Sequence, residues 1–402
     1  MKDVILVGAG QSADQCATIL RREGFDGSIL IVGEENHPPY QRPPLSKDYL
    51  AGKVDLDRVY SKKIEFYAKQ KIDLLLSTRV KKINRKDKSI LLSNSDKLSY
   101  KKLVLATGSR VRKLHVTGSC LSNIHYLRNI NDSENIKKHI KKDKKLVIVG
   151  AGYIGLEVAA VAAGKGMFVS VIEMEQRVMN RTVDPIISKY FEDLHKQHGV
   201  KIFLNTALKK FSGSNLVSKV ICSNGLELEA DLVVVGAGIL PNIELALDAG
   251  LECENGIIVD EYGKTGDSDI YACGDCTNHP NKILGKRLRL ESVHNAIEQA
   301  KIAAENICGI DNHYKSIPWF WSDQYDIKLQ IAGLSYKYDE TVIRGKIESR
   351  SFSCIYIKDQ FIIAIDSINN PGDFIQGKLL IENKTKIDRN TLSNPKIMLK
   401  DM

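Results

Sequence analysis

Long apolar runs are missing from this sequence of 402 residues. No stretch approaches the roughly 20 consecutive apolar residues that a membrane-spanning helix needs, so we do not expect a membrane protein. The first apolar run leads directly into a glycine turn, so we do not expect it to be a signal peptide. The eight cysteines are scattered without a disulfide framework, which favours a cytoplasmic location over secretion.

Metal-ligand patterns and nucleic-acid-binding modules are also missing. The nine histidines show no metal-ligand spacing, and we expect no metal site. Much of the net charge of +9 comes from lysine clusters such as Lys137-Lys138 and Lys141-Lys142. Such clusters are usually solvated surface, but a basic surface can also steer an acidic partner. No basic groove interleaved with aromatic residues accompanies them, so we expect no nucleic-acid partner.

Two glycine-rich turns are the most informative motifs present. Residues 4–13 read VILVGAGQSA and residues 146–155 read LVIVGAGYIG, each an apolar strand followed by the start of a helix. The first glycine permits the tight turn, the second lets the backbone approach a pyrophosphate, and the third small residue lets the helix pack on the strand. We therefore expect nucleotide contacts from Gly8, Gly10, Ser12, Ala13, Gly150, Gly152, Tyr153, Ile154 and Gly155.

An acidic residue stands where the ribose of each dinucleotide should lie. Glu34 follows the apolar segment 28–32, and Glu173 follows the apolar segment 168–172. Two dinucleotides are therefore expected to bind. Glu173 favours NADH, because its carboxylate would accept from a free ribose 2′-hydroxyl and repel a 2′-phosphate. Arg177 and Arg181 lie just downstream and leave NADPH open, since a nearby arginine can accommodate the phosphate.

The order of segments predicts an α/β fold with one interrupted domain. Strand-like and helix-like segments alternate through residue 310, which is typical of parallel α/β proteins. Three further strands end at small-residue turns, where we expect contacts from Ala106, Thr107, Gly108, Gly236, Gly238, Gly274 and Asp275. The strand before Asp275 must return to complete the first unit, because a flavin needs its ribitol held as well as its pyrophosphate.

The character of the chain changes after Pro318, where short alternating apolar segments predict a small α+β domain with an antiparallel sheet. We therefore predict two Rossmann-like dinucleotide-binding domains, the second inserted in the first, plus this C-terminal domain. The expected boundaries are 1–111 with 240–317 for an FAD-binding domain, 112–239 for an NAD-binding domain, and 318–402 for the C-terminal domain. With two nucleotide sites in one chain, the economical chemistry is hydride transfer from NADH to bound FAD.

Residues 39–47, which read PYQRPPLSK, resemble the flavin-proximal segment of the NADH-dependent ferredoxin reductases that serve bacterial oxygenases. The similarity covers nearly the whole chain in the same order, through residues 106–108, 150–157, 236–241, 274–275, 291–293 and 318–325. It implies an enzyme, a ferredoxin–NAD(+) reductase, that passes electrons singly to a small acidic [2Fe–2S] ferredoxin. A rubredoxin reductase, and a signalling flavoprotein like apoptosis-inducing factor, are the alternatives. We expect a monomer or weak homodimer.

The resemblance also implies roles for individual positions. FAD contacts are implied for Ser12, Glu34, Arg42, Lys47, Val80, Arg128, Asp275 and Val293. Lys47 is implied to lie near the flavin N5 and O4 edge, and Asp275 to accept from a ribitol hydroxyl. Glu157 and Glu291 are implied to flank the nicotinamide, which makes them catalytic candidates with Lys47. Trp321, or failing that Trp319, resembles the aromatic residue at the exposed flavin edge.

Cys273 and Cys276 invite a dithiol or zinc interpretation, which we do not favour. A disulfide oxidoreductase would place its pair on the helix after Glu34, and residues 37–52 contain no cysteine. A zinc site would need two further ligands, and only His279 lies nearby in the sequence. For docking of the acidic ferredoxin, the candidates are Arg287 and Arg289.

Overall fold

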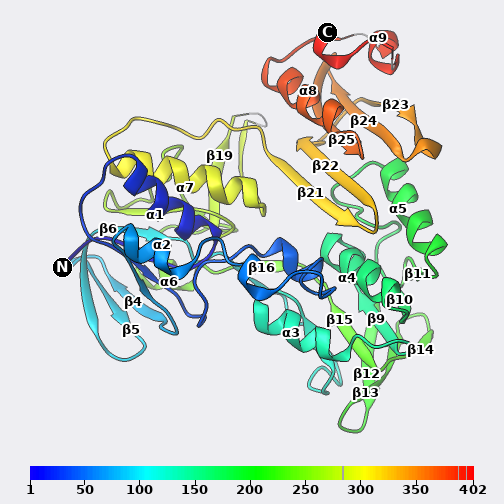
Figure 1. Cartoon of the computed structure of the whole chain (residues 1–402), viewed down its shortest axis with the longest axis horizontal. Coiled ribbons are helices and arrows are strands. Elements are labelled where there is room, and N and C mark those ends of the chain that lie inside the picture. The colour runs from blue at the N-terminus through cyan, green and yellow to red at the C-terminus, as the bar shows by residue number, and fades with distance from the viewer. Residues whose placement is uncertain (283–284, 388, 395) are drawn as a thin grey trace. The chain divides into compact units, whose positions relative to one another are not determined.

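Six sheets organise the chain in its computed structural model, which describes residues 1–282, 285–387, 389–394 and 396–402 (Figure 1). The chain divides into two units. Unit 1 contains residues 1–41, 55–110 and 239–316, and unit 2 contains residues 42–54, 111–238 and 317–402. Both units are discontinuous, in keeping with the predicted insertion of one domain in another. The predicted domain boundaries themselves stay a prediction. In the described part of the chain, no helix is long and apolar enough to cross a membrane.

The central sheet of unit 1 has a parallel part and an antiparallel part. The parallel strands run in the order β3–β2–β1–β6–β18, and β5 and β4 extend the sheet through an antiparallel pairing with β6. The strands are β1 (Lys2–Val7), β2 (Ile29–Val32), β3 (Ile72–Leu75), β4 (Val80–Asn84), β5 (Ser89–Leu92), β6 (Lys97–Leu105) and β18 (Ile270–Ala272). As predicted, the late strand β18 completes the first sheet, with Ile270 opposite Leu103.

Two helices of unit 1 pack closely through small residues. Helix α1 (Gln11–Arg22) and helix α7 (Val293–Ile307) lie side by side (Figure 1). Ala13 and Ala17 share a buried cluster with Ala300 and Ala303, which lets the helices approach. Other elements of unit 1 are η2 (Leu56–Arg58), α2 (Ile64–Lys69), α6 (Glu244–Asp248), β17 (Ile257–Ile258), β19 (Thr277–Asn281) and β20 (Lys286–Leu288).

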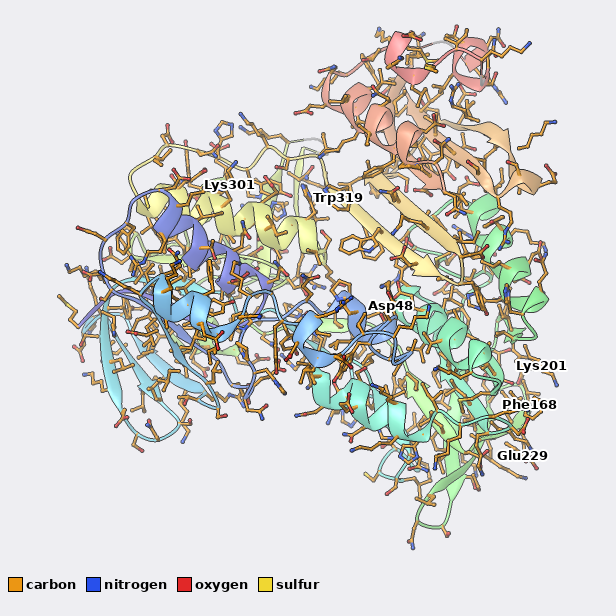
Figure 2. The ribbon with its side chains drawn as sticks, in the orientation of Figure 1. Asp48, Phe168, Lys201, Glu229, Lys301 and Trp319 are labelled. Atoms are coloured by element: carbon orange, nitrogen blue, oxygen red, sulfur yellow. The ribbon has the colours of Figure 1, made fainter. Side chains whose placement is uncertain are left out.

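Unit 2 contains a second parallel sheet, in the order β11–β10–β9–β15–β8. Its strands are β8 (Ile124–Tyr126), β9 (Lys145–Val149), β10 (Phe168–Ile172), β11 (Lys201–Phe203) and β15 (Leu232–Val235). Phe168 and Lys201 begin two of these strands and are exposed (Figure 2). The other elements are η1 (Pro43–Ser46), α3 (Ile130–His139), α4 (Tyr153–Gly164), α5 (Pro185–Gln197) and an antiparallel sheet of β12 (Leu208–Gly213), β13 (Val217–Cys222) and β14 (Glu227–Glu229). Strands β7 (Ser109–Val111) and β16 (Ile239–Pro241) lie where the chain passes between units.

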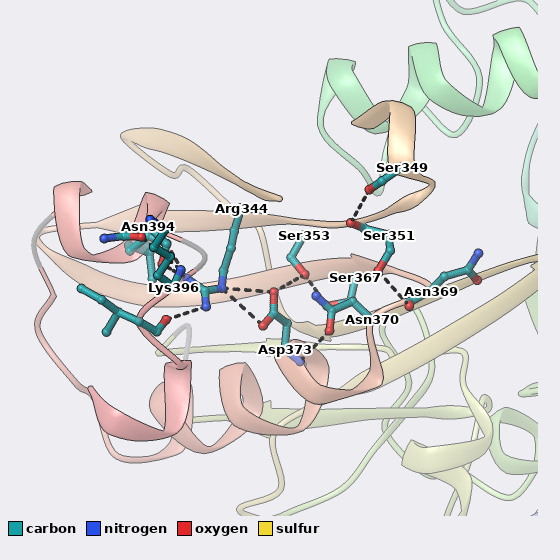
Figure 3. A network of polar contacts seen from close by, with 12 residues as sticks. Arg344, Ser349, Ser351, Ser353, Ser367, Asn369, Asn370, Asp373, Asn394 and Lys396 are labelled. Carbon is teal, nitrogen blue, oxygen red and sulfur yellow. Dashed lines mark hydrogen bonds and ion pairs between the residues drawn. The ribbon is translucent and has the colours of Figure 1, made fainter. Parts of the chain in front are cut away.

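The last residues of unit 2 form the predicted antiparallel sheet, in the order β21–β22–β25–β24–β23. Its elements are β21 (Trp319–Gln324), β22 (Ile327–Gly333), β23 (Glu340–Lys346), η3 (Ile347–Ser349), β24 (Ser351–Lys358), β25 (Phe361–Ile368), α8 (Pro371–Glu382), α9 (Arg389–Ser393) and η4 (Leu399–Asp401). The buried Arg344 donates to the carbonyls of Leu392, Asn394 and Ile397 and pairs with Asp373 (Figure 3). This one guanidinium therefore ties the end of the chain to the sheet.

Candidate functional site

The first glycine turn leaves room for a ligand in front of helix α1. Gly8 has a φ of +114°, and a Cβ there would lie 2.2 Å from the carbonyl oxygen of Ala106. Only glycine fits where the ends of β1 and β6 approach so closely. Gly10 caps α1, and a Cβ there would meet no described atom within 4 Å. The backbone N–H groups at the start of α1 suit a pyrophosphate, and Ser12 and Ala13 are buried behind the turn.

The predicted contact residues of unit 1 gather at one edge of its parallel sheet. Glu34, Ala106 and Gly274 follow the carboxyl ends of β2, β6 and β18, where open α/β sheets bind ligands. A Cβ on Gly274, whose φ is +87°, would lie 2.4 Å from the hydroxyl oxygen of Ser12. The carboxylate of Asp275 accepts a hydrogen bond from Ser109 over 2.8 Å.

Two residues that the sequence analysis missed hold this edge in place. The backbone carbonyl of Asn242 accepts from the Thr107 hydroxyl over 2.7 Å, and the Asn242 side-chain amide donates to the backbone carbonyl of Thr107 over 2.8 Å. The side-chain oxygen of Gln299 accepts from the Gly274 N–H over 2.7 Å and from the Thr277 hydroxyl over 2.8 Å. Asn242 directly follows residues 236–241, a segment that resembles the ferredoxin reductases, and this position was the one signal in the sequence that could have pointed to Asn242. Gln299 carries no motif, so nothing in the sequence pointed to it.

The remaining predicted positions of unit 1 differ in exposure. Glu34 is exposed and lies 3.6 Å from Arg79, whereas Val80 is buried at the start of β4. Val293 begins α7, whose cap is the Ser292 hydroxyl. Gly108 has a φ of +63°. The open glycine turn, the ribose acid and the Asp275 turn together fit the FAD predicted for this unit.

The second glycine turn repeats the geometry of the first. Gly150 has a φ of +104°, and a Cβ there would lie 2.5 Å from the Gly236 oxygen. A Cβ on Gly155 would lie 2.2 Å from the Gly150 oxygen, so the helix packs tightly behind the turn. At Gly152 and Gly238, by contrast, a Cβ would meet no described atom within 4 Å. The backbone is thus open in front of α4, which fits a nicotinamide dinucleotide.

Glu173 and the two downstream arginines have different surroundings. The Glu173 carboxylate accepts from the backbone N–H of Ala151 over 2.6 Å and of Glu175 over 3.0 Å. The Arg177 guanidinium donates to the carbonyls of Asn180 and Val183 and to the Ser188 hydroxyl. Arg181 is exposed. Arg177 is therefore engaged within its own loop, and Arg181 is the better placed of the two to meet a 2′-phosphate.

Lys47 and Glu157 form a largely buried ion pair in unit 2. Their charged atoms lie 2.7 Å apart, and the side chains are 14% and 3% exposed. The Glu157 carboxylate also accepts from Ser46 over 2.5 Å and from Ser322 over 2.6 Å. Lys47 was predicted to lie at the flavin edge and Glu157 beside the nicotinamide; the structure pairs the two side chains, and their roles toward the cofactors stay predictions. Ser46 and Ser322 were not singled out, although both lie in the similar segments.

Arg42, Arg128 and the tryptophans also lie in unit 2. Arg42 donates to the carbonyl of Arg128 over 2.6 Å. Trp319 lies on β21 (Figure 2) and packs against Phe374, with ring centres 5.8 Å apart. Trp319 and Trp321 are both half-buried, and their ring centres lie 5.5 Å apart. Which of the two tryptophans lies at an exposed cofactor edge stays a prediction.

The second glycine turn, which lies in unit 2, has an aromatic neighbour. The Tyr153 ring, next to Ile154, packs on Phe320 at 4.6 Å between centres. Glu291 belongs instead to unit 1, where it is exposed and pairs with Arg289. That Glu157 and Glu291 flank one nicotinamide stays a prediction.

Cys273 and Cys276 are fully buried in the cores on the sheet of unit 1. Burial raises the pKa of both thiols, and the Cys276 thiol donates to backbone carbonyls of Leu105 and Cys273. Such thiols are poor nucleophiles. The docking candidates are also engaged: Arg287 donates to the carbonyls of Val259 and Asn278, and the Arg289 side chain is only 12% exposed.

Comparison with known proteins matches the whole chain. A family model described as pyridine nucleotide-disulphide oxidoreductase matches residues 2–300, and one described as reductase C-terminal matches residues 319–402. Putidaredoxin reductase of Pseudomonas putida is 39% identical, covering 100% of this chain and 96% of that protein. A rubredoxin-NAD(+) reductase of Pseudomonas putida is 37% identical, covering 92% of this chain and 96% of that protein. The crystal structure of a covalent putidaredoxin reductase–putidaredoxin complex matches with a TM-score of 0.97 at 39% identity, covering 100% of this chain and 97% of that chain.

Proposed function

This chain belongs to the pyridine nucleotide-disulphide oxidoreductase family, and from that premise we propose that it is an FAD-dependent NADH:ferredoxin reductase. It takes a hydride from NADH and passes electrons singly to a [2Fe–2S] ferredoxin that feeds an oxygenase. The observation that carries the proposal is the presence of two complete dinucleotide cradles in one chain, each with an open glycine turn and a ribose acid. Bound FAD supplies the conversion between two-electron and one-electron chemistry.

Residues of unit 1 would hold the flavin cofactor. The N–H groups around Gly8 and Gly10 would bind the pyrophosphate, since a helix N-terminus favours an anion. Glu34 would accept from the ribose, and Asp275 would accept from a ribitol hydroxyl. Thr107, fixed by Asn242, would hold the backbone that faces the ligand.

Residues of unit 2 would bind NADH and place a positive charge near the reacting ring. Glu173 is held against the glycine turn, where it would accept from the 2′-hydroxyl. Lys47 carries a cation that Glu157 fixes within 2.7 Å. Because the pair is largely buried, removing either partner should cost about 3–5 kcal/mol and leave a charge uncompensated. No general acid or nucleophile is required for hydride transfer to a flavin.

The identity of the acceptor has a second candidate. The similarity to a rubredoxin-NAD(+) reductase supports rubredoxin as the alternative acceptor. A signalling role like that of apoptosis-inducing factor would need NADH binding without electron delivery. We also propose a cytoplasmic location, since the eight cysteines are all unpaired.

Reconstitution tests the proposal directly. We expect yellow protein with about one FAD per chain, and NADH-dependent reduction of cytochrome c that requires added ferredoxin. Substituting rubredoxin for ferredoxin in the same assay separates the two acceptors. Colourless protein that takes up no FAD would contradict the flavin assignment. Flavin that NADH reduces but that delivers electrons to neither protein would favour the signalling alternative.

A further inference from the structure

A buried chain of hydrogen bonds leads away from Glu157 to helix α5. Ser322 donates to one carboxylate oxygen of Glu157 over 2.6 Å, while Ser46 and Lys47 occupy the other. Behind Ser322, the side-chain amide of Gln324 donates to the Ser322 hydroxyl over 3.2 Å. Every group of this chain therefore lies within unit 2.

The series of hydrogen bonds continues through His195. Its Nε2 lies 2.8 Å from the Oε1 of Gln324, and its Nδ1 lies 3.0 Å from the hydroxyl of Tyr325. The Tyr325 ring in turn stacks on His198, with ring centres 3.7 Å apart. Ser322, Gln324 and His195 are fully buried, so water does not compete for these contacts.

The chemistry of the groups fixes one direction along this chain. An ionised carboxylate only accepts, so Ser322 must donate to Glu157 and accept from Gln324. Gln324 then turns its oxygen towards His195, which must donate from Nε2. Burial lowers the pKa of His195 to about 4, which keeps the ring neutral near pH 7. A neutral ring that donates from Nε2 has no proton on Nδ1, so Nδ1 accepts from the Tyr325 hydroxyl.

Four segments that are far apart in the sequence supply these groups. They are η1 with Ser46, α4 with Glu157, α5 with His195, and β21 with Ser322 and Gln324. Each donor points along the chain towards one carboxylate, and hydrogen bonds aligned in this way strengthen one another in a dry interior. The amide of Gln324 cannot pass a proton onward, so the arrangement holds a charge in place and is not a proton wire.

We propose that Tyr325, His195, Gln324 and Ser322 are positioning residues that orient the Glu157 carboxylate and, through it, the ammonium of Lys47. They set the rate of hydride uptake from NADH without contacting the nicotinamide. The inference rests on the proposed function, because it assigns Lys47 to the reacting end of the site. Through Ser322 and Gln324, the C-terminal sheet thereby acts on hydride uptake.

Two substitutions break the chain at successive links. Ser322→Ala removes the donor to Glu157, and Gln324→Glu keeps the shape of the side chain but loses the donor to Ser322. Ser353→Ala is the matched control, because Ser353 is a buried serine of the same sheet that contacts Ser367 and Asp373 instead (Figure 3). Ser322→Cys retains a weak donor and should fall between Ser322→Ala and the unmodified protein.

Rapid-mixing reduction of the flavin by NADH separates positioning from folding. In Ser322→Ala and Gln324→Glu we expect the limiting rate to fall about 5- to 50-fold, because small misplacements of a catalytic group carry costs of this order. The Kd for NADH should stay within about twofold, since binding depends on the glycine turn and Glu173. Ser353→Ala should change neither value. Unchanged limiting rates in both variants, or equal losses of rate, NADH affinity and bound flavin, would overturn the proposal.

Nitrogen NMR of the histidines tests the chain without turnover. The unmodified protein should show His195 neutral and protonated at Nε2 at about pH 6–7. In Gln324→Glu the new carboxylate should raise the pKa of His195, because an opposite charge favours the imidazolium. A His195 protonated at Nδ1 in the unmodified protein would overturn the proposed direction. If NADH fails to reduce the unmodified protein, the proposed function is wrong. The NMR result then still shows whether the hydrogen bonds run in the proposed direction.

Discussion

The carboxylate of Glu173 accepts the backbone N–H of Ala151 over 2.6 Å, which holds the acid against the second glycine turn. A second bond, from the N–H of Glu175, fixes the other oxygen. The negative charge is therefore set in one position beside the expected ribose, while the guanidinium of Arg177 is turned into its own loop. We expect the balance between this fixed acid and one exposed arginine, Arg181, to decide the choice between NADH and NADPH.

NADH should exceed NADPH in kcat/KM by about one to three orders of magnitude, because Glu173 would repel a 2′-phosphate. Glu173→Ala should narrow this gap, and steady-state kinetics with both cofactors measure it. Adding Arg181→Ala to the Glu173→Ala variant should widen the gap between NADH and NADPH again, because the binding of NADPH would be weaker. Arg177→Ala should lower the thermal midpoint with little change in the cofactor ratio. Equal use of both cofactors by the unmodified protein would show that Arg181 overrides the acid.

Replacing Cys273 and Cys276 together by alanine should leave flavin reduction and electron delivery nearly unchanged. Both thiols are buried with raised pKa values, so neither is a ready nucleophile. Thiol titration of the native protein should modify the exposed Cys120 first. Turnover of the variant and of the unmodified protein is compared per bound flavin. Protein that is lost because the two small cavities lower stability then does not affect the comparison. Loss of turnover with flavin content intact would revive the dithiol interpretation.

The stability of the protein should fall as the pH rises from about 5 to about 8.5, in part because of Asp366. This carboxyl is 1% exposed and accepts from Tyr356 over 2.5 Å, and burial raises its pKa to about 8. The folded state therefore holds a proton that the unfolded state, with an ordinary carboxyl pKa, has released. Each step in pH through this window favours unfolding.

Asp366→Asn should remove most of that slope and raise the thermal midpoint at about pH 8.5 by about 5 °C, while changing it less at about pH 5.5. Thermal unfolding at the two pH values measures the effect. Asp323→Asn is the control, since Asp323 is a partly exposed partner of Lys328 and should keep the slope of the unmodified protein. An unchanged slope in Asp366→Asn would show that Asp366 is ionised in the folded protein.

Ferredoxin-dependent turnover should fall several-fold as salt is added, whereas reduction of a small neutral acceptor by NADH should change little. The net charge of +9 favours an acidic partner, and exposed charges are screened beyond about 8–10 Å at physiological salt. Charge reversal at Arg287 is a less clean test, because its guanidinium also holds the carbonyls of Val259 and Asn278. An equal response of both activities to salt would reopen the choice of acceptor.

Local patterns were enough to predict the features that depend on neighbouring residues. The turns at Gly8 and Gly150 have the positive φ angles that their motifs require, and β18 joins the first sheet as the order of segments predicted. Features made by distant residues were out of reach. Glu157 contacts Ser46 at a separation of 111 residues and Ser322 at 165, and no spacing rule connects such positions. Likewise, the sequence did not indicate that residues 42–54 belong with unit 2.

The discontinuity of the two units has a consequence for synthesis on the ribosome. The chain passes from one unit to the other after residues 41, 54, 110, 238 and 316. A nascent chain that has reached residue 238 still lacks β18 and α7, so α1 has no partner for its small-residue face. Unit 2 is completed later still, because it needs β21, the strand that carries Ser322. Neither unit can be completed during early translation, and an unfinished chain must keep apolar surface exposed until residues 317–402 of unit 2 are made.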